Sequence, residues 1–467
     1  MSMFLQLVNS SQQSSQDLTQ WFGKIQHLPY AMLLDSASTN HPNSRYDILV
    51  ADPYLSLEAN DDDCMVTDYR QQTKQTFKEP PLILLKRLQQ QYCPKFSTPS
   101  LDLPFVGGVL GYFGYDLGRT LEKIPNQAIK EVMVPDLAVG FYDWALVLDK
   151  SNQQLWYIDQ QGDAEKSWQK RLAWFEQQAS NSEAEQPFSL VKDWQANMSK
   201  AEYLTKFAKV QQYLQSGDCY QINLAQRFAA PYSGSEWQAY LQLRQHNAAP
   251  FSAFIRLAQC SVLSISPERF LEVKNRQIET KPIKGTKPRF DAPELDQASA
   301  AALQTSEKDR AENVMIVDLL RNDLGKVCRP GSVKVPELFA IESFPAVHHL
   351  VSTVTGELAE QYQVIDALAA AFPGGSITGA PKIRAMQIIE ELEPHRRHLY
   401  CGAIGYLSDH GHMDTNIAIR TLVCAKQTIY AWAGGGIVAD SIADNEYQET
   451  FDKVAKILPI LGKGTDV

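Results

Sequence analysis

One lysine in the stretch KPIKGT is placed where it could act as a nucleophile. Lys284 follows Pro282, which fixes the backbone φ angle, and precedes Gly285, which lets the chain turn. A lysine attacks carbon only as the neutral amine, so its site must disfavour the ammonium by desolvation or by nearby positive charge. The candidates for that charge are Lys281, Lys287 and Arg289. The alternative interpretation is an exposed basic loop, the usual place of a lysine.

Two pairs of carboxylates lie three residues apart in segments with a helical pattern. They are Asp309 with Glu312 and Glu446 with Glu449. At this spacing each pair shares one helix face, where like charges repel unless a cation is bound. Four carboxylates from two helices are the hard oxygen ligands that Mg²⁺ prefers, so the pattern predicts a magnesium site if the helices meet. The alternative is two solvated faces compensated by Lys or Arg.

Two glycine-rich stretches are candidates for anion binding. Residues 372–382 run into a helix predicted at 383–392, which is typical of an anion site, but they lack the Gly-Lys-Ser/Thr ending of a P-loop. Residues 433–441 follow a strand predicted at 428–432 and match GxGxxA, but too little chain is expected after them for a dinucleotide domain. Their backbone N–H groups are candidates to receive a substrate carboxylate.

Three single residues have weaker signals. Arg420 ends an apolar alternating strand, where an arginine needs either a carboxylate ligand or a structural salt bridge. Glu268 follows a strand and Pro267, where burial would raise its pKa and make it a general acid. His349 is by itself more typical of a core histidine than of a catalyst.

The elements that must position these residues divide into two predicted regions. Residues 1–185 are predicted to mix helices with short strands, for example at 47–50 and 144–148, and the polar stretch 179–186 marks the boundary. The second region, 190–460, is the predicted catalytic domain.

The catalytic region begins with clear local signals. A capping box starts at Ser199, and apolar residues at helical spacing follow it as far as Gly217. The alternation over 220–225 then predicts a strand that carries Gln221 on its polar face.

Composition excludes several classes of protein. The chain has 467 residues, of which 44% are hydrophobic and 21% charged, so it has enough apolar residues for a large core. A net charge of −10 argues against general nucleic-acid or anionic-membrane binding. The seven cysteines form no CxxC pair, which argues against a disulfide framework or a cysteine zinc site. No signal peptide or membrane span is evident, so a cytoplasmic protein is expected. The Ser/Gln-rich stretch 9–16 is expected to be a loose connection.

Five segments together resemble the chorismate-utilising enzyme family. They are Ser266–Phe270, Pro282–Thr286, Asp309–Asp323, Gly374–Lys382 and Gly434–Glu449. The resemblance extends through residues 107–116 in the N-terminal half. It implies an α+β, anthranilate-synthase-like layered fold, in which two antiparallel sheets pack face to face with helices outside and both halves of the chain contribute to the sheets.

Within this family the resemblance implies amination of chorismate at C4, which gives 4-amino-4-deoxychorismate for 4-aminobenzoate and folate synthesis. Lys284 would attack C2 and form a covalent intermediate, and Glu268 would be the acid or base at the departing C4 hydroxyl. Anthranilate synthases of the family have alanine in place of Lys284. Isochorismate and salicylate synthases have a water-activating lysine in place of Gln221, so addition of water is disfavoured.

The resemblance also implies the binding residues. Glu312 and Glu449 would bind Mg²⁺ directly, with Asp309 and Glu446 in supporting positions. One substrate carboxylate would be held by the metal and the backbone of Gly434, Gly435 and Gly436, and the other by Arg420 and Tyr406. The residues implied around the ring are Thr286, His349 and Thr378.

Ammonia is expected from a separate glutaminase subunit, because no cysteine stands in a glycine-flanked nucleophile turn. A pocket for L-tryptophan is also implied. Its residues would be Ser36, Asn43, Ser44, Arg45, Tyr46, Pro250, Phe251 and Ser252. The alternatives to C4 amination are the activity of an anthranilate synthase component I and a tryptophan-binding protein without catalysis.

Overall fold

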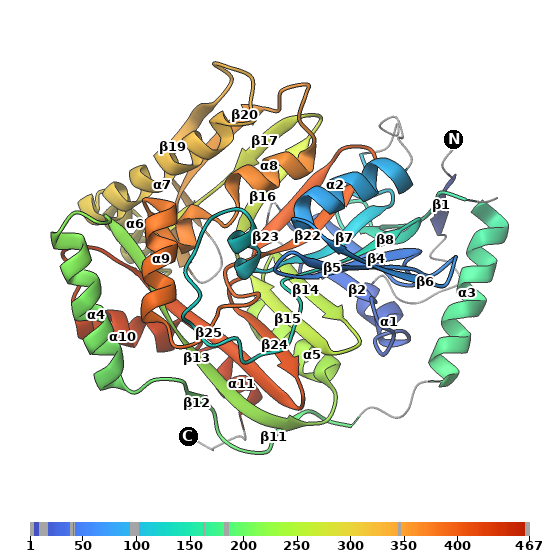
Figure 1. Ribbon diagram of the computed structural model, residues 1–467, viewed down its shortest axis with the longest axis horizontal. Helices are drawn as coiled ribbons and strands as arrows, with labels where there is room; N and C mark the ends of the chain where they lie inside the picture. Colours follow the sequence, from blue (N-terminus) through green and yellow to red (C-terminus); the bar gives the residue numbers. More distant parts are fainter. Residues whose placement is uncertain are drawn as a thin grey trace.

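The computed structural model describes residues 4–8, 17–37, 41, 43–93, 102–161, 164–181, 186–343 and 347–462. The stretch 9–16 and residues 182–185 of the predicted boundary lie outside this description. Within it, two large sheets pack against each other with helices around them, as the sequence predicted (Figure 1). Every pairing between named strands of the described chain is antiparallel.

The first sheet has 13 strands in the described residues and draws them from both halves of the chain. Its order is β1 (Phe4–Val8), β10 (Gln154–Asp159), β9 (Trp144–Asp149), β3 (Tyr46–Val50), β2 (Met32–Asp35), β14 (Phe251–Arg256), β15 (Cys260–Ser266), β24 (Thr421–Ala425), β25 (Thr428–Ile437), β13 (Gln221–Ser233) and β11 (Ser189–Leu190). Two short strands also pair with β13, namely β12 (Gln195–Ala196) and β21 (Gly379–Ala380).

The second sheet has 12 strands in the described residues and is also shared between the halves. Its order is β18 (Ile283–Pro288), β20 (Val347–Glu357), β17 (Gln277–Thr280), β16 (Arg269–Lys274), β23 (Met413–Ile417), β22 (Ala403–Ser408), β7 (Gly108–Phe113), β8 (Leu137–Tyr142), β4 (Leu55–Asn60), β5 (Asp63–Asp68) and β6 (Thr73–Lys78). The remaining strand, β19 (Lys334–Ser343), pairs with β20. Both sheets contain strands from before and after the predicted boundary. The division of the chain at 185–190 therefore stays a prediction.

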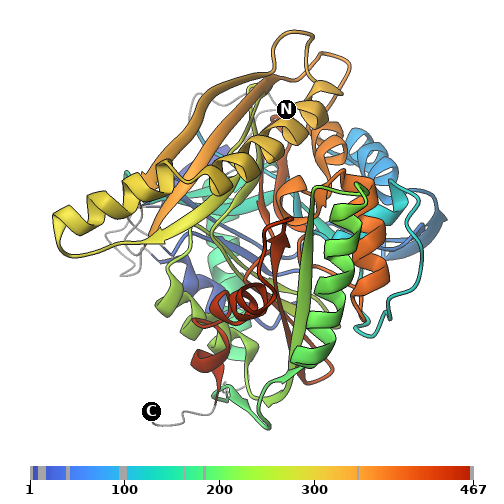
Figure 2. The same ribbon diagram turned by 90° about the vertical axis from the view of Figure 1, so that its left-hand side faces the viewer.

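Helices surround the sheets. They are α1 (Leu18–Gly23), α2 (Pro81–Tyr92), α3 (Ala164–Asn181), α4 (Lys200–Gln215), α5 (Glu236–Asn247), α6 (Pro293–Gln304), α7 (Glu307–Gly325), α8 (Val364–Ala371), α9 (Lys382–Leu392), α10 (Ala443–Asp452) and α11 (Leu458–Leu461), with 3₁₀ turns η2 (Tyr115–Thr120) and η3 (Gly375–Ile377). Figure 2 shows α6 and α7 lying along the long hairpin of β19 and β20. No helix of the described chain combines the length and the apolar character needed to cross a membrane.

Strand β9 illustrates why the sheets are buried on both faces. Ala145 and Val147 join the core between the two sheets, whereas Trp144, Leu146 and Leu148 pack into a second core under the outer helices. Successive side chains of a strand point to opposite faces, so a strand between two apolar layers must be apolar throughout.

Local sequence signals explain two elements that lead to the site. The capping box predicted for α4 is present, because Ser199 and Glu202 each bind the other's backbone N–H. In β13, Ile222 and Leu224 face the core, but Gln221 and Asn223 on the opposite face are buried too, and Tyr220 lies exposed before the strand. The predicted polar face of β13 therefore faces the interior of the protein.

Candidate active site

A cavity of about 610 Å³ brings together most of the residues that the sequence singled out. Lys284 and Glu268 line it, together with Arg420 and His349. All four carboxylates of the predicted magnesium site line it as well. These residues come from strands of both sheets and from α7 and α10, elements far apart in sequence.

Lys284 reaches this cavity because strand β18 is bulged. The register between β18 and β20 shifts between Lys284 and Thr286, with Gly285 at φ +78°. Such a bulge needs a residue that tolerates the left-handed region, and it re-aims the neighbouring side chain. A Cβ at Gly285 would also lie 2.8 Å from the Asp309 carboxylate, so only glycine lets α7 approach this closely.

The electrostatic surroundings of Lys284 favour the neutral amine through desolvation. Burial lowers the lysine's pKa, and the facing carboxylates of Glu312 and Glu268 oppose that shift. Of the two causes that the sequence left open, desolvation is the larger, and Lys281, Lys287 and Arg289 are not among the charges that act most on Lys284. Lys281 pairs with Glu342 at 3.2 Å, Arg289 pairs with Asp296 at 2.8 Å, and Lys287 lies exposed. The cation that contributes a smaller lowering is Lys453, from α10's C-terminal end.

Glu268 is held next to Lys284 by one serine of η3. The Lys284 ammonium donates to the Ser376 carbonyl at 3.3 Å, and the Ser376 hydroxyl donates to Glu268 Oε1 at 3.4 Å. Glu268 is only 7% exposed, and burial raises its pKa to about 7 despite the opposing charge of Lys284. An amine pushed toward neutrality and a carboxyl pushed toward protonation thus share one cavity, as nucleophile and general acid chemistry require.

The two acidic pairs line one cavity, which their spacing alone left open, but among the described residues no three of these four bring one carboxylate oxygen each within 4.8 Å of one another. Helix α7, capped by Ser306, carries Asp309 and Glu312, and α10 carries Glu446 and Glu449. Burial raises the pKa of both Glu312 and Glu446, and the charges of neighbouring carboxylates add to the rise. Such a set is electrostatically unfavourable without additional positive charge.

Two observations fit a cation at these carboxylates. Glu446 Oε2 is buried and has no hydrogen-bond partner among the described residues. A Cβ on Gly435 would lie 3.0 Å from Glu449 Oε1 and 3.2 Å from Glu446 Oε2, so glycine keeps the space beside both oxygens open. Glu449 Oε1 is held at 2.6 Å by the Lys453 ammonium, and a metal ion would have to displace that contact. The donors are all hard oxygens, which suits Mg²⁺.

The second glycine stretch is part of a strand, not a loop. Gly434–Gly436 continue β25 and pair with β13 through Ala225, Leu224 and Asn223. Pairing of β25 with β24 ends at Ala431, so in the described chain the other backbone edge of the glycines has no strand beside it, and Gly434 and Gly436 line the cavity. A strand edge with unpaired N–H groups retains the predicted capacity to bind a carboxylate.

Arg420 lies in the turn between β23 and β24, with φ at +50°. No hydrogen bond or ion pair of its side chain is found among the described residues, so the structure gives no support to the salt-bridge alternative. His349, whose Nδ1 lies 2.9 Å from the Thr286 hydroxyl, lines the same cavity. Burial and then the charge of Arg420 lower its pKa to about 4, so its ring is neutral at pH 7. A neutral ring beside a guanidinium leaves the positive charge available for an anion.

Three expectations about this cavity need correction. Tyr406 lies on β22 and packs against Phe105, with ring centroids 5.5 Å apart, and it faces a different cavity. Thr378 is fully buried, and its hydroxyl donates to the Gly374 carbonyl at 3.0 Å, so it folds the glycine loop instead of lining the cavity. The α9 N-terminus is not among the described residues that line the cavity.

Several lining residues were not predicted. They are Asn223, Lys308, Ser376, Tyr400, Trp432, Asp452 and Lys453. Lys453 had a readable signal, because it follows Glu449 by four residues, the spacing of a helical ion pair. Ser376 lies within residues 372–382, the first of the two glycine-rich stretches predicted to bind an anion.

A second cavity of about 340 Å³ has Tyr406 in its wall. It is lined by most of the residues implied for tryptophan, namely Asn43, Arg45, Tyr46, Pro250, Phe251 and Ser252. Ser36 and Ser44 do not line it. The Ser36 amide and hydroxyl both donate to Asp47 Oδ1, at 2.8 and 2.9 Å, and Ser44 is buried.

Comparisons with known proteins identify the family of the chain. The model of the chorismate binding enzyme family matches residues 30–459. Aminodeoxychorismate synthase component 1 of Escherichia coli K12 is 53% identical over 443 residues, which cover 95% of this chain and 96% of that protein. Anthranilate synthase component 1 of Geobacillus stearothermophilus is 36% identical and covers 91% of this chain and 88% of its own length.

A solved structure extends the comparison to the fold. Anthranilate synthase component I of Streptococcus pneumoniae superimposes with a TM-score of 0.78 at 33% identity, over 90% of this chain and 93% of that one. This similarity confirms the predicted layered α+β fold. Because the family match spans nearly the whole chain and the site lies within it, this protein belongs to the chorismate binding enzyme family.

Proposed function

We propose that this chain is the synthase component of an aminodeoxychorismate synthase, which aminates chorismate at C4 to give 4-amino-4-deoxychorismate for 4-aminobenzoate and folate synthesis. The observation that carries the proposal is the pairing of Lys284 with Glu268 through Ser376. The 53% identity to a protein of that name over 95% of the chain supports it.

In the proposed reaction Lys284 acts first, as a neutral amine. Its nitrogen forms a bond to C2 of chorismate, the ring double bonds shift, and the C4 hydroxyl leaves. Glu268, protonated because burial raises its pKa to about 7, donates the proton that converts this hydroxyl to water. Ammonia then adds at C4, the double bonds shift back and Lys284 is released. The net reaction consumes chorismate and ammonia and yields aminodeoxychorismate and water.

The substrate carboxylates, the metal ion and the substrate ring are each assigned to polar groups that line the cavity. The guanidinium of Arg420 receives one substrate carboxylate, and the open backbone edge of Gly434–Gly436 lies where it can receive the other. Glu312 and Glu449 are the proposed direct ligands of Mg²⁺, with Asp309 and Glu446 beside them. When bound, the ion would supply positive charge for a substrate carboxylate. Neutral His349 and Thr286 lie where they can contact the ring.

Ammonia is proposed to come from a separate glutamine amidotransferase subunit. The designation "component 1" of the similar proteins, which implies a second component, supports this partner.

We also propose that the second cavity binds L-tryptophan. The side chains of Tyr46 and Phe251 would contact the indole. Calorimetric titration of the purified chain with L-tryptophan tests this directly, and absence of a binding isotherm would remove the assignment.

The experiment that tests the proposed activity is product identification. The purified chain is incubated with chorismate, Mg²⁺ and ammonium at mildly alkaline pH, and products are separated by chromatography and weighed by mass spectrometry. Aminodeoxychorismate is expected. Anthranilate would support the alternative assignment, an anthranilate synthase component I, and unchanged chorismate would support a binding protein without catalysis.

A further inference from the structure

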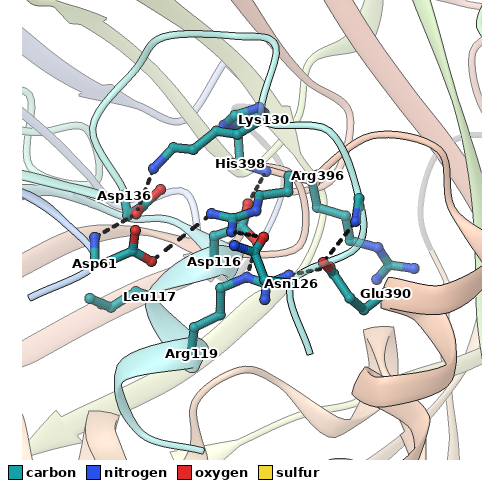
Figure 3. A network of polar contacts seen from close by, with 12 residues as sticks. Asp61, Asp116, Leu117, Arg119, Asn126, Lys130, Asp136, Glu390, Arg396 and His398 are labelled. Atoms are coloured by element: carbon teal, nitrogen blue, oxygen red, sulfur yellow. Dashed lines mark hydrogen bonds and ion pairs between the residues drawn. The ribbon is translucent and has the colours of Figure 1, made fainter. Parts of the chain in front are cut away.

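A second cluster of ionisable residues lies outside the cavity described above. Asp116 of η2, Asp136 immediately before β8, and His398 between α9 and β22 each bring one ligand atom within 4.8 Å of the others (Figure 3). All three side chains are 1% exposed. None of them lines the cavity that contains Lys284.

Some of the polar atoms in this cluster lack partners. Both ring nitrogens of His398 and the Oδ1 atom of Asp136 are buried without a hydrogen bond in the described chain. The ring's neighbour is Trp432, at 6.4 Å between ring centroids, and the Trp432 Nε1 donor is likewise buried without a partner in the described chain. A buried polar group without a partner is unfavourable, so three adjacent ones are a reason to look for a bound species between them.

The other atoms of the two carboxylates are already fixed. Asp116 accepts from Arg119 at 3.1 Å and from the His398 backbone N–H at 2.8 Å. Asp136 Oδ2 accepts from Lys130 at 3.0 Å and from the backbone N–H of Asp61 at 2.9 Å. These contacts orient the carboxylates and leave Asp136 Oδ1 without a partner in the described chain, and outer contacts of this kind are typical of metal ligands.

Charged side chains of both signs surround the cluster. A neutral imidazole at His398 would have a lone pair to donate to a cation. Figure 3 shows carboxylates and cationic groups together around the cluster, and the guanidinium of Arg227 also acts on His398. The carboxylates are Asp61, Asp116, Asp136 and Glu390. The cationic groups are Arg119, Lys130 and Arg396.

We propose that Asp116, Asp136 and His398 form a binding site for a first-row divalent transition metal ion, with Zn²⁺ as the reference ion and water completing its coordination. One imidazole and two carboxylates suit Zn²⁺ or Co²⁺ better than Mg²⁺, which prefers oxygen ligands only. This set is distinct from the cysteine zinc sites that the sequence excluded.

The ion would connect η2, the start of β8 and the loop before β22. That loop also carries Arg397, which donates to the carbonyls of Asn223 and Ile377 at 2.8 and 3.0 Å. Both of these residues line the active-site cavity. The proposed ion is therefore structural, and it would stabilise the segment that supports the cavity wall.

The test uses Co²⁺ as a spectroscopic probe on the full-length chain after removal of metals with a chelator. His398→Asn is the main variant, because His398 has φ at +52° and asparagine tolerates this conformation. Asp136→Asn is the second variant. Two controls remove other places where Co²⁺ could bind. They are Glu449→Gln in the active-site cavity and the double variant His410→Asn/His412→Asn, whose rings lie 3.9 Å apart.

Calorimetry in excess Mg²⁺ and visible absorption are expected to show one Co²⁺ ion bound to an imidazole in the wild type and in both controls. In His398→Asn and in Asp136→Asn the affinity should fall at least about 100-fold, since even loss of an outer contact costs about 10- to 100-fold. Equal Co²⁺ affinity in the wild type and in His398→Asn would overturn the proposal. Loss of the Co²⁺ signal in one of the two controls, but not in His398→Asn or Asp136→Asn, would overturn it too. No binding by the wild type would overturn it as well, whatever reaction the chain catalyses.

Discussion

Protonation of Glu268 is the step whose consequences can be worked out most fully. A carboxyl with a pKa of about 7 is half protonated at pH 7, whereas one at the ordinary 4.5 would be protonated in only about 0.3% of molecules. Burial therefore increases the acid form roughly 150-fold at neutral pH. Glu268→Gln keeps the shape of the side chain but cannot donate a proton, so kcat should fall by about 10²- to 10⁴-fold.

The pH dependence separates this role from a merely structural one. The assay measures aminodeoxychorismate formation as kcat/KM for chorismate, which reports the free enzyme, with total ammonium adjusted to hold free ammonia constant. Above its pKa the folded protein loses the proton of Glu268, so the acid form decreases tenfold per pH unit and the profile should break near pH 7. In Glu268→Gln that break should vanish. An unchanged break near pH 7 in the variant would refute the assignment of the acid.

Three further predictions concern other parts of the cavity. Lys284→Ala should reduce aminodeoxychorismate formation by several orders of magnitude and shift residual product toward anthranilate; unchanged product and rate would exclude the covalent role. Gly435→Ala places a methyl group 3.0 Å from Glu449 Oε1, so half-activation should need about 10- to 100-fold more Mg²⁺, whereas Gly325→Ala, with open space around it, should match wild type in the same titration. Arg420→Ala should raise KM for chorismate about 10- to 150-fold, the loss of a charge-assisted hydrogen bond worth about 1.5–3 kcal/mol, and an unchanged KM would place the carboxylate elsewhere.

The local features of this protein could be predicted from sequence because their causes are local. The capping box at Ser199 fixed the start of α4, and the three-residue spacing of Asp309 and Glu312 placed both on one face of α7. The bend at Lys284 was expected from Pro282 and Gly285, and the structure shows it as a bulge in β18. Whether α7 and α10 meet depends on the packing of distant elements, which spacing does not encode.

The errors also have physical causes. Gly434–Gly436 lack side chains that signal a strand, and their extended conformation comes from pairing with β13. The assignment of Tyr406 depended on resemblance, but side chains alternate along β22 and this one faces the second cavity. Which of two causes lowers the pKa of Lys284 could not be decided from sequence, because the burial comes from remote segments while sequence neighbours such as Lys281 find partners of their own.

A covalent bond between Lys284 and the substrate is the central claim of this account. The direct measurement is to mix the chain with chorismate and Mg²⁺ without ammonia, quench rapidly in acid and determine the mass of the intact protein and of its peptides. The expected result is an adduct on Lys284 with the mass of chorismate less one water, absent in Lys284→Ala. Formation of aminodeoxychorismate on adding ammonia, with no adduct at any time and an active Lys284→Ala, would contradict it.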